Sequence, residues 1–340
     1  MESLYPHLPQ IWLALIAFFL LYYVVTDGSD LGIGIISLFF GREAERGAMM
    51  ESIGSVWHGH QTWLVLLGGM LFGAFPVFYA VLLSSLYIPM ILMLIGLALR
   101  GVSFEFRARA GSKGIWSRAF GIGSLITAGS QGLALGGLLG GLDIRNSVFA
   151  GDIWAWLTPF SVVVAFGVIV GYTMLGANYL IMKTEGQLQE RAYRFSGVAA
   201  GITLVVAATA HIWVTFKYPF TLEKWVTPGF STALPLLLAA AFFAFVLFFR
   251  SLVRRKELAP FIFNVAVILF SFSALSLSFY PNMIPNLSPE SISVGEAAAS
   301  SGTLAFMLVA MAVLLPIILT YTVFVYRTFR GKVAIEATEY

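Results

Sequence analysis

Residues 25–34 read Val25-Thr26-Asp27-Gly28-Ser29-Asp30-Leu31-Gly32-Ile33-Gly34, and residues 57–63 read Trp57-His58-Gly59-His60-Gln61-Thr62-Trp63. Both runs lie in or against stretches that are apolar enough to span a lipid bilayer. A carboxylate or an imidazole in hydrocarbon is costly, so it must face a partner, a water-filled path or a subunit interface. The two runs therefore predict a helical membrane protein with functional polar groups inside its bundle.

The composition indicates the same class of protein. Hydrophobic residues make up 59% of the 340 residues and charged residues 11%, whereas a soluble domain carries about 25% charged residues. We therefore expect an all-α, polytopic membrane protein that forms a single integral membrane domain over residues 1–340. The chain has no cysteine, which excludes disulfides, iron–sulfur clusters and thiolate-bound metals within it.

Apolar stretches of about 20 residues mark the expected membrane-spanning helices. We expect nine, over residues 10–35, 52–74, 77–99, 117–140, 157–182, 194–216, 230–250, 259–280 and 302–327. The second stretch is the least regular, because His58, His60 and Gln61 lie in its first half. The first nine residues carry no Lys or Arg, so the first stretch is expected to remain as a helix and not to be removed as a signal peptide.

The distribution of Lys and Arg tests the number of spans, because cytoplasmic loops of membrane proteins are rich in both. With nine spans, nearly all of the 20 basic residues fall on one side of the membrane. The asymmetry disappears if residues 52–74 do not cross. We therefore expect the N-terminus outside the cell and the C-terminus in the cytoplasm.

Ionisable residues from separate segments are expected to gather in the cytoplasmic half of the protein. Asp27 and Asp30 are three residues apart and share one helix face. His58 lies a turn or two from the cytoplasmic side, and Arg100 and Glu105 lie just beyond the cytoplasmic end of the third predicted helix. Such groups suit a proton path from the cytoplasm. An Asp30–Arg100 ion pair that locks two helices together is the alternative of equal weight.

A metal site at the two histidines is disfavoured by their spacing. His58 and His60 are turned about 200° apart on a regular helix, whereas a helical metal site prefers histidines four residues apart. Phosphate-binding and dinucleotide-binding motifs are missing from the sequence as well. We therefore expect no metal and no cofactor to be bound by this chain.

The run at residues 25–34 resembles the opening signature of subunit II of cytochrome bd-type quinol oxidases. Several later segments are similar to further blocks of that family: Gly41-Arg42, Glu45-Arg46, Met49-Met50, Ser52-Ile53, Trp57, Gly59, Gln61, Trp63-Leu64, Ala74-Phe75-Pro76, Tyr79-Ala80, residues 100–107 and residues 315–322. The resemblance is strongest over residues 10–110.

The resemblance implies a subunit of a complex in the bacterial inner membrane that oxidises quinol, reduces dioxygen to water and generates proton motive force. Haem b and haem d and the quinol-oxidising loop would belong to the partner, subunit I, and a small accessory membrane subunit is a further candidate partner. This chain would hold no catalytic residue and would be inactive alone. The matching positions give His58 a role in proton transfer and Trp63 a role in oxygen access.

The second run departs from the family, which usually reads Trp-Asp-Gly-Asn-(Gln/Glu)-x-Trp. Here His58 and His60 stand in place of the acid and the asparagine. An imidazole can also relay protons, and its pKa is nearer neutrality than that of a carboxylate. A divergent branch with altered haem content or cyanide sensitivity is the other interpretation, and the sequence does not choose between ubiquinol and menaquinol.

Two other functions fit part of the pattern. A proton-coupled secondary transporter would also carry intramembrane Asp and His, but it would favour inverted repeats and helices broken near the midplane. A purely structural assembly subunit would tolerate the loss of Asp30 and His58 except through stability.

Overall fold

Long helices make up most of the computed structural model, which describes residues 2–284 and 291–333. The helices are η1 (Glu2–His7), α1 (Leu8–Ser37), α2 (Glu43–Gly54), α3 (Trp57–Ala74), α4 (Pro76–Ser85), α5 (Tyr87–Arg109), α6 (Lys113–Leu139), α7 (Pro159–Lys183), α8 (Gly186–Lys217), α9 (Pro219–Glu223), α10 (Phe230–Val253), α11 (Ala259–Phe279), α12 (Val294–Ala297) and α13 (Ser301–Thr328). Two small antiparallel pairs complete the fold: β1 (Ile144–Arg145) with β2 (Val148–Phe149), and β3 (Asn282–Ile284) with β4 (Ile292–Ser293).

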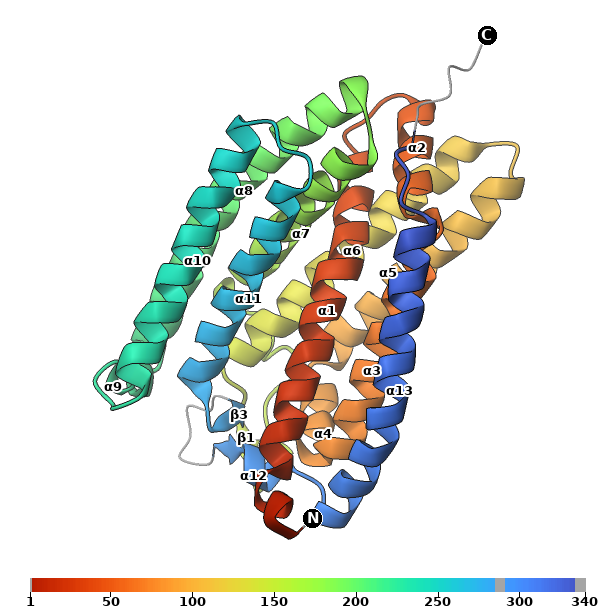
Figure 1. Cartoon of the computed structure of the whole chain (residues 1–340). Coiled ribbons are helices and arrows are strands. Elements are labelled where there is room, and N and C mark those ends of the chain that lie inside the picture. The colour runs from red at the N-terminus through yellow and green to blue at the C-terminus, as the bar shows by residue number, and fades with distance from the viewer. Residues whose placement is uncertain (1, 285–290, 334–340) are drawn as a thin grey trace.

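The helices run roughly side by side, so the bundle has two distinct ends (Figure 1). The N-terminus, the strand pairs and α12 lie at one end. Helix α2 and the last turns of α13 lie at the other, which we call the α2 end.

The number of membrane-crossing helices agrees with the prediction. Within the described ranges, eight helices are long and apolar enough to cross a membrane, and the bent pair α3–α4 raises the number to as many as nine. Most of the predicted spans coincide with one helix each. Helix α8 is longer than its predicted range, because it begins at Gly186 and not near residue 194.

The prediction of one span over residues 77–99 is wrong. Helix α4 ends at Ser85 and α5 begins at Tyr87, while the chain bends by 119° between α3 and α4. Pro76 occupies the first turn of α4, and a proline cannot continue a preceding helix because it lacks the amide hydrogen and its ring clashes with the turn before. The surrounding residues are almost all apolar, so hydropathy alone does not detect the break.

The later start of α5 changes the position of two candidate residues. Arg100 and Glu105 were expected beyond the end of a helix, but α5 runs to Arg109 and contains both. Arg100 is fully buried, whereas Glu105 is exposed. A buried guanidinium within an apolar helix requires a partner of opposite charge.

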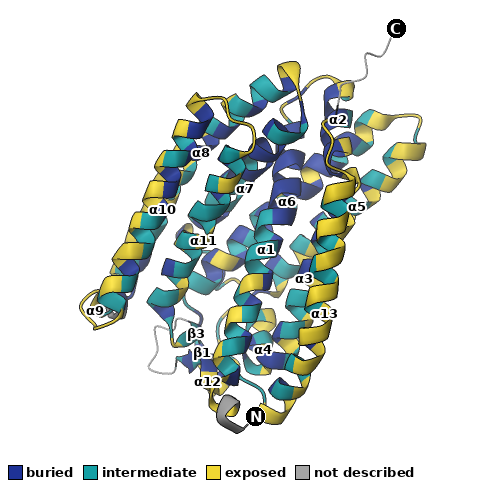
Figure 2. Ribbon diagram, in the orientation of Figure 1, coloured by how far each residue is buried: buried dark blue, intermediate teal, exposed yellow. Residues whose placement is uncertain are grey.

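The C-terminal half of α1 is the centre of the bundle. Every residue from Thr26 to Ser37 is buried, so this part of the helix is covered on all sides (Figure 2). Its closest neighbour is α7, where Gly32 and Gly176 meet: a Cβ atom added at Gly32 would lie 2.9 Å from the backbone nitrogen of Gly176. Small residues allow helix backbones to approach in this way.

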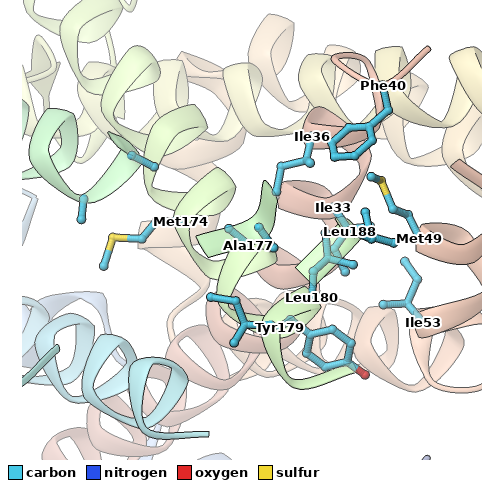
Figure 3. Packing of buried hydrophobic residues seen from close by; sticks show 14 of the residues in the cluster. Ile33, Ile36, Phe40, Met49, Ile53, Met174, Ala177, Tyr179, Leu180 and Leu188 are labelled. Atoms are coloured by element: carbon cyan, nitrogen blue, oxygen red, sulfur yellow. The ribbon is translucent and has the colours of Figure 1, made fainter. Parts of the chain in front are cut away.

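A hydrophobic cluster closes the α2 end. Helix α2 lies at this end, and its Met49 and Ile53 are fully buried against Ile33, Ile36 and Phe40 (Figure 3). Residues of α6, α7, α8 and α10 complete the cluster. In contrast, α13 is largely exposed, with only Leu304 and Met311 buried among its residues (Figure 2).

Candidate functional site

An ion pair between Asp27 of α1 and Arg100 of α5 lies inside the bundle. Both side chains are completely buried, and an Nη atom of Arg100 donates to Oδ1 of Asp27. Taking two charges out of water is costly, and their attraction offsets that cost only when each keeps its partner. Each of the two charges therefore needs the other in order to remain buried.

A second buried carboxylate, Asp30, is bound to an imidazole and not to Arg100. Nδ1 of His60 lies 2.7 Å from Oδ2 of Asp30, and Nε2 of His60 lies 2.7 Å from the hydroxyl oxygen of Tyr326. Asp30 is 0% exposed and His60 3%. Helices α1, α3 and α13 thus meet at one hydrogen-bonded group of three side chains, which we call the relay triad.

The prediction of an ion pair between Asp30 and Arg100 is therefore wrong, because the acid that pairs with Arg100 is Asp27. Among the described residues Arg100 pairs with Asp27, and the Asp30 carboxylate is engaged by His60. The sequence provided no reason to place His60 beside Asp30, because the two are 30 residues apart and on different helices.

The two histidines face in opposite directions, as their spacing predicts. His58 is exposed, and its ring stacks on that of Trp57 with 3.6 Å between the ring centroids. His60 points inward. His58 was the imidazole expected to be functional, but the structure brings His60 to the buried carboxylate. The signal that could have found it is this turn of about 200°, since exposing one histidine of such a pair buries the other.

The two buried groups are close enough to act on each other. Arg100 is within electrostatic reach of both Asp27 and Asp30. Four of their buried atoms have no hydrogen-bond partner within the described part of the chain: Oδ2 of Asp27, Oδ1 of Asp30, and Nε and one Nη of Arg100. Two acceptors and two donors complement ordered water, which commonly satisfies buried polar groups.

Polar side chains continue along α1 toward the middle of the bundle. Tyr23 lies one turn before Asp27, and its hydroxyl oxygen accepts a hydrogen bond of 2.7 Å from Nε2 of Gln131 on α6. The hydroxyl of Tyr172 on α7 donates to Oε1 of Gln131, also at 2.7 Å. Residues 23, 27 and 30 of α1 therefore form a polar line that begins near the α2 end.

The remaining candidates lie apart from this line. Trp63 is 1% exposed and packs against aromatic residues of α1, with its ring centroid 4.0 Å from that of Tyr22. Trp63 is therefore part of the contact between α1 and α3. Glu105 and His58 lie on the exposed surface of α5 and α3. Among the residues that the structure describes, no three His, Cys, Asp or Glu side chains form a metal-binding group.

Ion pairs at the α2 end fasten the helices outside the apolar region. Oε1 of Glu43 accepts hydrogen bonds from Arg107 at 2.9 Å and from Ser117 at 2.5 Å, which ties α2 to α5 and α6. Arg191 of α8 pairs with Glu45 at 3.2 Å. Helix α2 is thus held to several neighbours by charge as well as by its buried apolar side chains.

The residues after α13 form a second fastening, the C-terminal clasp, which comprises residues 329–333. Nζ of Lys183 donates to the carbonyl oxygen of Phe329 at 2.8 Å, and the amide of Val333 donates to the carbonyl oxygen of Lys183 at 2.7 Å. Lys332 pairs with Glu257 at 2.7 Å. The hydrogen bond from Lys332, supported by Gln189, lowers the pKa of the Glu257 carboxyl.

The fold and its buried charges define a class of protein: a polytopic helical membrane subunit with charged and hydrogen-bonded groups buried toward one end. Comparison with known proteins makes the assignment specific. The family described as cytochrome bd terminal oxidase subunit II matches residues 8–329. Subunit 2 of the cytochrome bd-I ubiquinol oxidase of Escherichia coli K12 is 31% identical, covering 98% of this chain and 97% of the relative. Subunit 2 of the cytochrome bd ubiquinol oxidase of Bacillus subtilis is 27% identical, with 96% and 97% covered.

A solved structure shows the same fold. A chain in the structure of bd oxidase from Geobacillus thermodenitrificans superposes with a TM-score of 0.79 at 20% identity, covering 95% of this chain and 98% of that one. The chain belongs to the cytochrome bd terminal oxidase subunit II family. The transporter alternative finds no support among these relatives.

Proposed function

We propose that this chain pairs with a haem-bearing subunit I in the bacterial inner membrane, in a complex that oxidises quinol and reduces dioxygen to water. Subunit I would carry haem b and haem d and would do the redox chemistry, and this chain would be inactive without it. The names of the relatives, which are ubiquinol oxidase subunits, support the substrate class. The contribution of this chain is a proton path, and the buried Asp27–Arg100 and Asp30–His60 pairs are the observation that carries this proposal.

We infer the orientation of the chain from its basic residues. The helix bounds place most basic residues in or beside α2 and the helix ends around it: Arg42, Arg46, Arg107, Arg109, Lys113, Arg118, Arg191, Arg194, Arg250, Arg254, Arg255, Lys256, Arg327, Arg330 and Lys332. Cytoplasmic ends of membrane proteins have such an excess of Lys and Arg. We therefore assign the α2 end to the cytoplasm, which gives protons a short way to Asp30.

Each candidate residue has a distinct role in this proposal. Asp30 and Asp27 hold and pass protons inside the chain. His58 and Glu105 lie on its surface, so they suit the point at which a proton crosses between this chain and a covering subunit. Trp63 shapes oxygen access through the packing of α1 against α3.

The proposal is tested first on the native complex, purified gently. We expect haem b and haem d absorption bands from a co-purifying subunit and quinol-driven oxygen uptake in the same sample. This chain expressed alone should be colourless and inactive. A colourless, partner-free native preparation without oxygen uptake would contradict the proposal.

The proton path is tested by Asp30→Asn in the complex. The variant keeps the size of the side chain but cannot accept and release a proton, so oxygen uptake should fall by about tenfold or more. The haem spectrum reports whether the complex still assembles. Normal uptake with a normal spectrum would leave only the structural role of Asp30.

A further inference from the structure

We infer that Tyr326 and His60 form a proton relay into Asp30, with Tyr326 as the entry point on α13. This inference rests on the proposed function and adds to it the residues through which protons reach the buried carboxylate. Neither residue belongs to the set of candidates that the sequence provided.

The geometry of the relay triad fits proton transfer. Both ring nitrogens of His60 are engaged at 2.7 Å, one by Asp30 and the other by Tyr326. The relay starts with Asp30 ionised. An ionised carboxylate only accepts hydrogen bonds, so in this state Nδ1 of His60 carries the proton and donates it to Asp30. Nε2 is then the acceptor, and the hydroxyl of Tyr326 donates to it. The three groups therefore form one continuous donor-to-acceptor chain that points toward Asp30.

The transfer balances without any further reactant. The Nδ1–H bond of His60 breaks as an O–H bond forms on Oδ2 of Asp30. The hydroxyl O–H bond of Tyr326 breaks as an N–H bond forms on Nε2 of His60. The Tyr326 oxygen takes a proton from a hydronium ion of the solvent, which leaves a water molecule. One proton has then moved from the solvent to Asp30, and the proton on the imidazole has moved from Nδ1 to Nε2. A half-turn of the ring resets the relay once Asp30 has passed its proton on.

Exposure increases along the relay in the direction that entry requires. Asp30 is completely buried, His60 is nearly so, and Tyr326 is half-buried in the last turn of α13. That turn lies at the α2 end of the bundle (Figure 1). The surface end of the relay is thus at the end that we assign to the cytoplasm.

Helix α13 does not depend on the relay triad for its position, because other hydrogen bonds hold it near both of its ends. Nε1 of Trp12 donates to the carbonyl oxygen of Leu304 at 3.0 Å near the start of α13. Lys183 holds the carbonyl oxygen of Phe329 just after its end. Removing the hydroxyl of Tyr326 should therefore leave α13 in place.

The test compares oxygen uptake by complexes that carry Tyr326→Phe or His60→Gln, with Tyr321→Phe as the matched control on the exposed face of the same helix. Both relay variants should slow uptake by about tenfold or more and leave the haem spectrum unchanged. They should also show a larger solvent isotope effect, because proton delivery becomes limiting. The control should match the unmodified complex.

The pH profile separates a relay from a merely structural contact. The titratable and charged groups that face the relay are Asp30, Asp27 and Tyr22 of α1, Arg100 of α5, Tyr179 of α7 and Tyr326 of α13. His60→Gln removes the imidazole, whose two ring nitrogens carry the relay, so the pH dependence of oxygen uptake should differ from that of the unmodified complex. Introducing 3-fluorotyrosine at position 326 keeps the packing but makes the hydroxyl more acidic, and the profile should shift to lower pH.

The outcomes distinguish this inference from the proposed function. If Asp30→Asn is slow but both relay variants keep the normal rate, isotope effect and pH profile, the relay is wrong and the proton path stands. If Asp30→Asn is also fully active in an assembled complex, both are wrong. Slow relay variants with a larger isotope effect, an altered pH profile, a normal haem spectrum and a normal Tyr321→Phe control would establish the relay.

Discussion

Arg100 is a full positive charge in the middle of an apolar helix, and Asp27 makes that position tolerable. The pair is completely buried, so either charge alone would be left without compensation. Buried pairs of this kind are weak evidence for stability as a whole, but breaking one side is strongly destabilising. The two residues should therefore depend on each other far more than either depends on its apolar neighbours.

We predict that Asp27→Leu destabilises the complex by about 3–5 kcal/mol, because it leaves the Arg100 guanidinium unpaired. The double variant Asp27→Leu with Arg100→Met should recover most of that loss. Thermal unfolding followed by haem absorption measures both. As a control, Asp143→Asn removes an exposed ion pair with Arg145, which is worth about 0–1 kcal/mol. A double variant no more stable than Asp27→Leu would contradict the account.

At the level of single residues, the sequence predicted only part of the candidate site. The sequence indicated Asp27, Asp30 and Arg100 because charged residues in or near an apolar stretch need a reason. It did not indicate which acid Arg100 pairs with, since both acids share one face of α1. Tyr326 could not be found, because nothing in an aromatic-rich last helix distinguishes a tyrosine that meets His60 from one that faces lipid.

At the level of the helices, the crossing of α1 and α7 depends on two glycines, Gly32 and Gly176. A Cβ atom at Gly176 would lie 2.8 Å from Cα of Gly32, so the backbones would have to separate. This crossing also positions the polar line on α1, because Tyr172 of α7 reaches Gln131 from the same side. The packing and the candidate site are therefore linked through one helix pair.

We predict that Gly176→Ala destabilises the complex by about 1–3 kcal/mol through overpacking. Gly201→Ala on α8 is the matched control, since an added Cβ there meets nothing within 4 Å. The thermal stability of the assembled complex measures both variants. Equal stability of the two would show that α1 and α7 can separate without cost.

The C-terminal clasp should loosen in acid. The pKa of Glu257 is lowered by Lys332 and Gln189, so its contribution to stability is present above the ordinary carboxyl pKa and is lost as the pH falls through the lowered value. Lys332→Ala should remove the contribution at all pH values. Amide hydrogen exchange at Val333, whose amide donates to Lys183, should be faster in that variant. Exchange that is unchanged by Lys332→Ala would contradict this role.

At the scale of the whole molecule, the sequence was enough to predict an all-α bundle of about nine spans. Hydropathy detects the length of an apolar segment, and basic residues detect its ends. Neither detects a break between apolar residues, so the bend at Pro76 and the start of α5 at Tyr87 were missed. Because of this error, Arg100 and Glu105 were predicted to lie in a loop, whereas both lie in α5. An error about a helix boundary thus became an error about the candidate site.

The orientation can be tested directly, because the chain has no cysteine of its own. Val148→Cys in β2 should react with a membrane-impermeant maleimide added to intact spheroplasts. Ser112→Cys, between α5 and α6, should react only after the membrane has been opened. The reverse pattern would place the α2 end outside the cell and remove the cytoplasmic entry at Tyr326.

The position of α13 determines when the relay triad can form during synthesis. His60 and Tyr326 are 266 residues apart in the chain, and ribosomes add roughly 5–20 residues per second. Asp30 and His60 must therefore spend tens of seconds in the membrane before Tyr326, the third residue of the triad, is synthesised. During that interval helix pairs such as α5–α6 and α7–α8 can assemble around them. The relay is completed last, so a chain that stops early would be inserted and packed but would have no entry for protons.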